Sequence, residues 1–181
     1  MNSSAPLEAN IDEIALITSV KAGNADDFRP LVECYQAGVV RYIFYLVRDQ
    51  DIAEDIAQEA FVIAYQKLHQ YNKRYAFSTW LYRIARNLAY QYLRSNRTLP
   101  LKFEDNLESD KPEPSESIDK DIEATRIRSA IATLNPDQRT VVYLHYWEGR
   151  RYKEIADILD KPVNTIRTWL RRAKQELRSK L

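Results

Sequence analysis

Cysteine and histidine are scarce in this sequence, and their scarcity excludes several kinds of site. The single cysteine, Cys34, cannot form an intramolecular disulfide, and the two histidines, His69 and His145, lie at no recognisable zinc-ligand spacing. Cys34 falls in an apolar helical pattern, which predicts a buried structural thiol, and no nearby base indicates a nucleophile. We expect His145 to be a core or partly buried residue. No catalytic residue, metal site or cofactor is therefore predicted.

Long apolar runs are also missing. No segment approaches the roughly 20 apolar residues that a membrane span needs, so we expect no direct membrane insertion. The N-terminus has no basic residue before Lys21 and no apolar h-region, which argues against a signal peptide and predicts a cytoplasmic protein. Only three glycines occur among 181 residues, and long stretches are rich in Ala, Leu, Ile, Arg, Lys and Glu. These features predict an all-α fold.

The net charge of +1 hides a polarised chain. Residues 1–96 carry ten basic and eleven acidic side chains, residues 97–120 four and seven, and residues 121–181 thirteen and eight, giving net charges of −1, −3 and +5. The middle segment also contains Pro100, Pro112 and Pro114 and few apolar residues. We interpret 97–120 as a flexible acidic linker between two small helical domains, after a mobile tail at 1–11.

Acidic residues are absent from Ala60 to Phe103, although they are common on both sides. Basic and aromatic side chains alternate there, which is typical of a surface that neutralises phosphates and stacks unpaired bases. The alternative is that the rings form a helical core, and Trp80 above all fits that alternative. The residues left for DNA are the loop Asn72–Ser78 and the polar edge of the next helix, with Arg83, Arg86, Asn87 and Tyr90.

Apolar periodicity predicts the helices of the first domain. A short helix spans about 11–20, and a second begins near Ala25 and ends at Gly38. The run 39–47 fits a buried helix better than a strand, and a helix over 51–68 follows. Ser78 or Thr79 is the expected N-cap of the next helix, whose inward stripe includes Trp80.

Acidic side chains crowd the start of the helix over 51–68. The helix dipole accounts for two or three of them. The segment contains more acidic residues than that: Asp49, Asp51, Glu54, Asp55 and Glu59. An acidic surface that faces a protein partner is therefore an equal alternative to the helix-dipole explanation.

The C-terminal segment predicts a helix-turn-helix. A first helix ends at Asn135–Pro136, a second begins at Asp137, and helices over 153–159 and 163–177 are joined by a three-residue turn. The last helix is apolar on one side and cationic on the other, as in a recognition helix for the major groove. Binding to a membrane surface is the weaker alternative, because the narrow apolar stripe is needed to cover the preceding helices.

Two blocks resemble region 2 of the extracytoplasmic-function (ECF) sigma factors of bacterial RNA polymerase. They are Asp51-x-Ala53-Glu54-Asp55-x-x-Gln58-Glu59-x-Phe61 and Phe77-x-Thr79-Trp80-Leu81-x-x-Ile84-Ala85-Arg86-Asn87. The resemblance implies that residues 12–96 form sigma region 2, which docks on the clamp of the largest polymerase subunit and melts the −10 promoter element. The docking residues would be Asp55, Gln58 and Glu59. The single-stranded −10 contacts would be Asn72, Lys73, Arg74, Tyr75, Phe77, Arg83, Arg86 and Asn87.

The C-terminal residues 121–181 resemble region 4 of the same family. The matching blocks are Leu134-x-Pro136-x-Gln138-Arg139-x-Val141, Glu148-Gly149, Tyr152-x-Glu154-Ile155-Ala156 and Thr165-Ile166-Arg167-Thr168-x-Leu170-x-Arg172-Ala173. The resemblance implies recognition of duplex DNA at the −35 element by Asn164, Thr165, Arg167, Thr168, Arg171, Arg172 and Lys174. It also implies that the linker enters the polymerase channel and that an anti-sigma factor binds this protein.

The sequence departs from the family pattern at three places. Asn72-Lys73-Arg74-Tyr75 replaces a loop that often contains glycine and acids, Trp169 stands where arginine is frequent, and Asp160 replaces a turn glycine. Asp tolerates a left-handed turn, so we expect the fold to persist.

Two other functions compete with a sigma factor. A helix-turn-helix activator would bind duplex DNA but would need neither the acidic block nor a single-strand surface. A hydrolase or redox enzyme using Cys34 and a histidine would need a cluster of reactive groups, which the sequence lacks.

Overall fold

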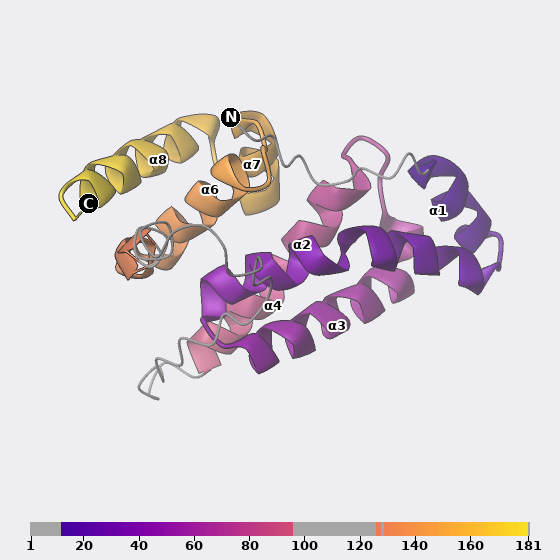
Figure 1. The fold of residues 1–181 in the computed structure, drawn as a ribbon. Coiled ribbons are helices and arrows are strands. Elements are labelled where there is room, and N and C mark those ends of the chain that lie inside the picture. The colour runs from indigo at the N-terminus through magenta and orange to yellow at the C-terminus, as the bar shows by residue number, and fades with distance from the viewer. Residues whose placement is uncertain (1–11, 96–125, 128, 181) are drawn as a thin grey trace, which may run out of the picture.

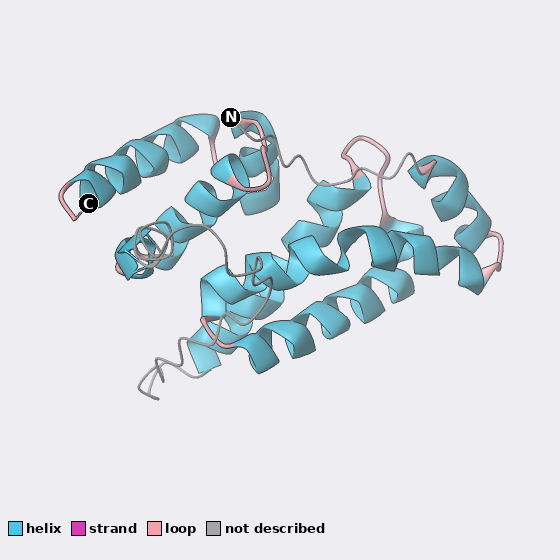
Figure 2. Ribbon diagram, viewed as in Figure 1, coloured by secondary structure: helices cyan, strands magenta, loops and turns pink. Residues whose placement is uncertain are grey.

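Helices pack in two groups, one on each side of residues 96–125 (Figure 1). The computed structural model describes residues 12–95, 126–127 and 129–180. The first group comprises α1 (Glu13–Lys21), η1 (Ala25–Phe28), α2 (Arg29–Val47), α3 (Gln50–Gln66), η2 (Leu68–Gln70) and α4 (Phe77–Ser95). The second comprises helical residues at 129–132, then α6 (Pro136–Tyr146), α7 (Tyr152–Leu159) and α8 (Val163–Arg178). The described residues contain no strand, which confirms the all-α prediction (Figure 2). The tail 1–11 and the linker 97–120 lie outside them.

Helix α2 is longer than the sequence predicted. A short 3-10 turn precedes it, and the helix then continues through Gly38 to Val47, so the predicted break at Gly38 is wrong. Gly38 is required by close packing instead. A Cβ atom there would lie 2.6 Å from the hydroxyl oxygen of Tyr82, which is too close for any side chain. The helical interpretation of 39–47 is confirmed.

Helix α3 runs antiparallel to α2, α4 runs antiparallel to α3, and all three pack against one another (Figure 1). Asp49 caps α3, where its carboxylate accepts a hydrogen bond from the Ile52 amide at 3.0 Å. Helix α4 begins at Phe77, so the predicted N-cap at Ser78 or Thr79 is wrong. Both side chains are buried inside the first turn, where they pack rather than cap.

The helix-turn-helix is confirmed at α7 and α8. Asp160 ends α7 in the left-handed conformation with φ of 51°, as expected for a residue in place of the usual glycine. A reciprocal capping box of Asn135 and Gln138 begins α6, with Pro136 at its first position. The start of α6 and the end of α7 therefore lie where the local sequence predicts them.

The two helix groups share one hydrophobic core. The ring of Tyr42 in α2 lies 5.1 Å from that of Tyr82 in α4 and 6.0 Å from that of Tyr143 in α6. Trp80 packs against this core, as predicted. Cys34, predicted to be a buried structural thiol, is partly buried.

Candidate nucleic-acid interface

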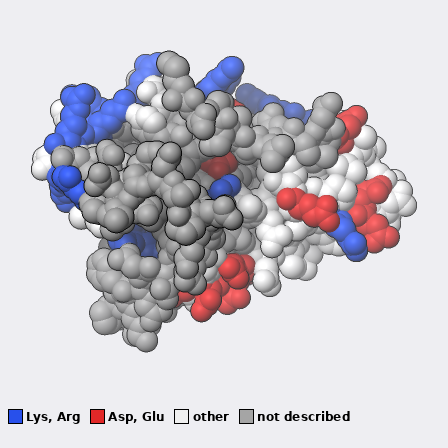
Figure 3. All heavy atoms as spheres, in the orientation of Figure 1, with Lys and Arg blue, Asp and Glu red and all other residues white. Residues whose placement is uncertain are grey.

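The acidic side of α3 faces solvent. Asp55, Gln58 and Glu59 are all exposed, while Ile56, Ala57 and Ala60 between them are buried. This alternation follows from the 3.6-residue helical repeat, which turns one face to the core and the other outward. Figure 3 shows acidic side chains gathered at the lower edge of the molecule, over the start of α3.

Two apolar side chains extend the exposed face of α3. Val62 and Tyr65 are 54% and 44% exposed, and they follow Gln58 and Glu59 by one helical turn or more. The sequence analysis named neither residue among the docking contacts. Their helical spacing from Asp55 was the available signal, because residues three or four apart share a face.

The loop between η2 and α4 is held by its own side chains. The Tyr71 hydroxyl donates to the carbonyl oxygen of Tyr75 at 2.7 Å, and the Asn72 amide oxygen accepts from the Arg74 backbone at 2.9 Å. Asn72, Lys73 and Arg74 are exposed. The guanidinium carbons of Arg74 and Arg83 lie 5.9 Å and 5.8 Å from the centre of the Tyr75 ring. The Tyr75 ring thus has two cations close to it, one from the loop and one from α4.

Phe77 does not reach this surface. Its side chain is completely buried, with its ring 5.8 Å from that of Tyr71 and 6.4 Å from that of Phe28. The prediction that Phe77 contacts DNA is therefore corrected: its position at the first residue of α4 points it into the core. Asn87, ten residues further along α4, is exposed as predicted.

Arg83 and Arg86 lie on the side of α4 that meets the second helix group. Arg83 donates from Nε and Nη2 to the carbonyl oxygen of Asp157 at 3.1 Å and 2.5 Å, and its Nη2 lies 3.8 Å from a carboxylate oxygen of Asp160. The Arg86 guanidinium lies over the Tyr90 ring at 4.5 Å. Both arginines are only partly exposed, which the sequence could not indicate.

The polar side of α8 is cationic. Asn164, Arg167, Arg171 and Lys174 are exposed and recur at steps of three and four residues, opposite the buried Ile166, Leu170 and Ala173. Figure 3 shows basic side chains at the upper left, over α8. Such a stripe can neutralise phosphates and reach base edges in a major groove.

Other predicted −35 residues lie at the edge of that stripe. Thr165 and Thr168 are partly buried, and the Thr168 hydroxyl donates to the carbonyl oxygen of Asn164 at 2.9 Å. Arg172 is exposed but lines a pocket of about 240 Å³ with Trp169. The predicted −35 residues thus form two groups. The outward stripe of α8 consists of Asn164, Arg167, Arg171 and Lys174, and its flank consists of Thr165, Thr168 and Arg172.

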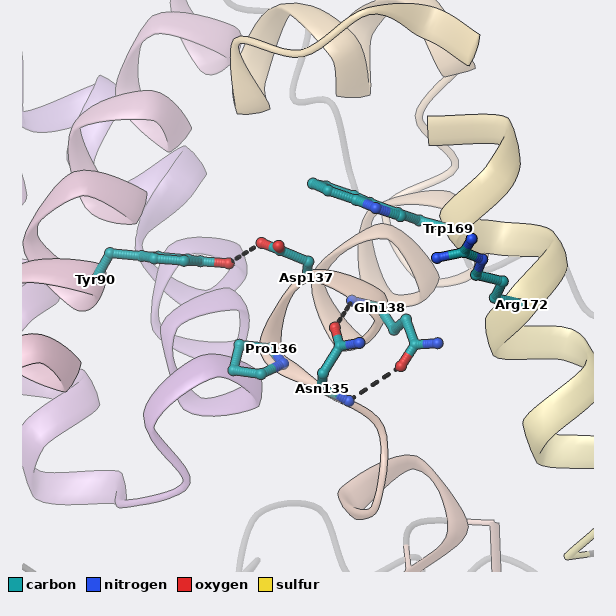
Figure 4. A pocket seen from close by; sticks show the side chains of 7 residues that line it. All are labelled: Tyr90, Asn135, Pro136, Asp137, Gln138, Trp169 and Arg172. Atoms are coloured by element: carbon teal, nitrogen blue, oxygen red, sulfur yellow. Dashed lines mark hydrogen bonds between the residues drawn. The ribbon is translucent and has the colours of Figure 1, made fainter. Parts of the chain in front are cut away.

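The pocket lies between α4, α6 and α8 (Figure 4). Tyr90 points from α4 toward Asp137 of α6 and donates a hydrogen bond from its hydroxyl to the carboxylate. Burial and this carboxylate raise the pKa of Tyr90 above its ordinary value. Trp169 lies across the opening from Tyr90, so its ring belongs to the flank of α8 rather than to the outward stripe.

The described residues bring together no group of three or more His, Cys, Asp or Glu side chains suited to a metal ion. His145 is partly buried, as predicted, and its Nδ1 lies 3.1 Å from the carbonyl oxygen of Arg150. Among the same residues, none of the helices has both the length and the apolar character of a membrane span.

Comparison with known families agrees with this arrangement. The family model for sigma-70 region 2 matches residues 31–98, and the model for sigma-70 region 4 matches residues 124–177. The two matches correspond to the two helix groups and leave the acidic segment between them.

Individual relatives match over nearly the whole chain. The ECF RNA polymerase sigma factor SigW of Bacillus subtilis is 31% identical, with 91% of this chain and 94% of the relative covered. The RNA polymerase sigma-H factor of Pseudomonas aeruginosa is 35% identical, with 90% of each covered. The sigma factor RpoE of Bartonella quintana, solved in complex with the anti-sigma factor NepR, has the same fold at 22% identity, with a TM-score of 0.69 and coverage of 84% of this chain and 95% of that one. The protein belongs to the ECF family of RNA polymerase sigma factors, which are transcription initiation factors rather than enzymes.

Proposed function

We propose that the three surfaces divide the work of promoter recognition. The exposed face of α3, with Asp55, Gln58 and Glu59, docks on the clamp of the largest polymerase subunit. The loop 72–75 and the polar edge of α4 hold the opened −10 strand, and α8 binds the −35 duplex. Residues 12–96 and 121–181 act as the two functional domains, in the cytoplasm.

One observation carries this assignment: a single chain presents an exposed acidic helix face on α3 and an exposed cationic one on α8. Acidic side chains repel nucleic acid and favour a basic protein partner. The cations of α8, including Arg167 and Arg171, attract DNA and repel such a partner. The two faces are thus suited to different ligands, as a protein that connects a polymerase to a promoter requires.

The −10 assignment rests on the loop before α4. Tyr75 lies within 6 Å of the guanidinium groups of Arg74 and Arg83, which can approach phosphates on either side of an unpaired base that stacks on this ring. Stacking of one base on an aromatic ring is worth about 1–3 kcal/mol, which offsets part of the cost of unstacking it from the duplex. Asn87 of α4 offers an exposed amide to the same strand, whereas Phe77 is left out of the contact set because it is buried.

A protein inhibitor is a further expected partner. The Bartonella quintana neighbour was solved with an anti-sigma factor, and the likeness of fold supports a partner of the same kind for this chain. The identity of that partner does not affect the assignment of the three surfaces.

Two sets of substitutions test the division of labour. Asn87→Ala should impair promoter opening while polymerase binding is retained. Asp55→Ala with Glu59→Ala should weaken polymerase binding, while the complexes that still form open the promoter normally. The control is Gln36→Ala, an exposed position on α2, a helix that carries none of the three surfaces, and it should behave as wild type. Opening is followed by permanganate reactivity of unpaired thymines, and binding by titration of labelled protein with core polymerase. Equal losses in both assays from either variant would contradict the assignment.

A further inference from the structure

A large aromatic side chain lies exposed at the end of α6, beside the cationic stripe of α8. Tyr146 is 51% exposed, and the ammonium nitrogen of Lys174 lies 5.6 Å from the centre of its ring. Lys174 belongs to the outward stripe that the proposed function assigns to duplex DNA. The exposed ring thus contacts one cation of that stripe.

Lys174 has cationic neighbours on its own helix. Arg171 precedes it by three residues and Arg178 follows it by four, so the three side chains share a face and repel one another. The carboxylate of Glu176 is paired with Lys180 at 3.8 Å, and among the described residues no carboxylate forms an ion pair with Lys174. Without other support, a ligand would have to order this long side chain at a cost in conformational entropy.

The Tyr146 ring holds the ammonium without neutralising it. The face of an aromatic ring attracts a cation through the ring's quadrupole, whereas a carboxylate would cancel the charge. A hydrogen bond with the Tyr146 side chain also raises the pKa of Lys174, so this neighbour favours the charged form of the amine. Lys174 is thus kept in place with its charge available to an external anion.

The Tyr146 ring is in turn supported by its neighbours. The ring of His145 meets it edge to face at 4.8 Å and lies 5.0 Å from the ring of Tyr152, the first residue of α7. The Nδ1 atom of His145 lies 3.1 Å from the carbonyl oxygen of Arg150, which orients the imidazole. The end of α6 and the start of α7 therefore position Tyr146 beside α8.

The place of Lys174 along α8 indicates which anion it meets. The first residues of a recognition helix contact base edges, and Lys174 follows Asn164 by ten residues, about 15 Å along the helix axis. The major groove is about 12 Å wide, so a side chain this far along lies beyond the base edges and beside the phosphate backbone.

We propose that Tyr146 is a positioning residue for the −35 duplex: it holds the Lys174 ammonium ready to contact a backbone phosphate at the edge of the groove. This inference rests on the proposed role of α8. A cation that is already in place loses less conformational entropy when it meets a phosphate. Such a contact adds affinity that does not depend on base sequence.

The test measures binding of the full chain to a pool of short DNA duplexes of random sequence, by fluorescence anisotropy at several salt concentrations. Tyr146→Leu replaces the ring with an aliphatic side chain, Lys174→Ala removes the cation, and the two changes are measured singly and together. Trp147→Leu is the matched control. Trp147 is also exposed at the end of α6, but its ring stacks on that of Tyr143 at 6.3 Å and lies 5.7 Å from that of Tyr45.

Tyr146→Leu should weaken duplex binding by about two- to fivefold, which is the most that one exposed cation–π contact supplies. Lys174→Ala should weaken binding at least as much and should reduce the steepness of the salt dependence by about one phosphate contact. In the Lys174→Ala background, Tyr146→Leu should have no further effect, because its role passes through Lys174. Trp147→Leu should bind as wild type does.

Three kinds of result would overturn the inference. Unchanged binding in Tyr146→Leu would mean that the ring does not position the cation. An equal loss from Tyr146→Leu in the Lys174→Ala background, or from Trp147→Leu, would mean that the end of α6 acts only through the fold. Absence of duplex binding in every form, wild type included, would remove the proposed role of α8 itself, so the two failures are distinguishable.

Discussion

Arg139 in α6 donates a hydrogen bond from Nη2 to the carbonyl oxygen of Leu46, 3.2 Å away in the last turn of α2. Its Nη1 donates to the carbonyl oxygens of Ala132 and Leu134 at 3.1 Å and 3.2 Å. The side chain is 7% exposed, and burial lowers its pKa to about 10. One buried cation thus meets the negative ends of two helices, from different halves of the chain.

Replacing this guanidinium should destabilise the fold. Arg139→Met leaves the carbonyl oxygens of Leu46, Ala132 and Leu134 without this donor, and we expect a loss of about 3 kcal/mol in the free energy of unfolding. Urea denaturation followed by circular dichroism measures it. Arg48→Met is the comparison, because Arg48 also donates to Ala132, at 3.3 Å, and should cost about 1 kcal/mol or less. A midpoint unchanged by Arg139→Met would contradict this role.

Alkaline pH should lower the free energy of unfolding through two buried tyrosines. Burial and the Glu148 carboxylate raise the pKa of Tyr82 and Tyr143 above the ordinary tyrosine value of about 10. Below that pH both the folded and the unfolded chain keep these protons, so the stabilisation is fully present. As pH rises toward the folded pKa, only the unfolded chain releases them, and stability falls by up to about 1.4 kcal/mol per pH unit for each tyrosine.

Stability measured by urea denaturation across this pH range should therefore decline less steeply in Tyr82→Phe with Tyr143→Phe than in wild type. Arg139 titrates in both proteins, so its contribution cancels in the comparison. An identical slope would mean that these hydroxyls are not protected by the fold.

The helices were largely predictable from local sequence, but some of their ends were not. Asn135 and Pro136 predict the start of α6, because a capping box is formed by residues within four positions of one another. Gly38 suggested a helix end by its low propensity, yet the helix continues there because Tyr82, far along the chain, needs the space. The N-cap of α4 was misplaced for a similar reason: Ser78 and Thr79 are good caps by type, but tertiary packing buries them.

The candidate site was predictable where it depends on one helix. Asp55 and Asn87 are exposed because helical periodicity alone decides their face. Arg83 was expected to be free for DNA, yet Asp157, more than seventy residues later, holds it. Trp169 gave no interpretable signal, because its place at the pocket depends on how the halves meet. Contacts between distant segments leave no periodic trace in the sequence.

The apolar end of the α3 face should contribute to polymerase binding. Val62→Ser with Tyr65→Ser removes two exposed apolar side chains beside Gln58 and Glu59, and we expect about 1–3 kcal/mol weaker binding to core polymerase. Fluorescence titration of labelled protein with core polymerase gives the dissociation constant. Ile14→Ser changes an exposed apolar residue on α1 and serves as the control, since it should bind as wild type does. If Ile14→Ser weakened polymerase binding as much as Val62→Ser with Tyr65→Ser, then exposed apolar area in general, and not the α3 face, would determine the affinity.

Arg167 should determine part of the −35 preference. It lies on the outward stripe of α8, and a bidentate contact with guanine is worth about 1–3 kcal/mol of discrimination. Arg167→Ala should flatten selection at one or two positions when a duplex library randomised at −35 is selected with the holoenzyme. Trp169→Phe, on the pocket side, should leave the selected sequence unchanged. An unaltered sequence preference in Arg167→Ala would count against its base contact. An altered preference in Trp169→Phe would count against the division of α8 into an outward stripe and a flank.

The central claim is that this protein alone gives core RNA polymerase its promoter specificity. The most direct measurement is transcription in vitro from a library of DNA fragments of the source genome, with core polymerase and with this chain as the only specificity factor. We predict a small set of discrete start sites, each dependent on the chain and lost with Asp55→Ala and Glu59→Ala. Transcripts no different from those of core polymerase alone would contradict the account.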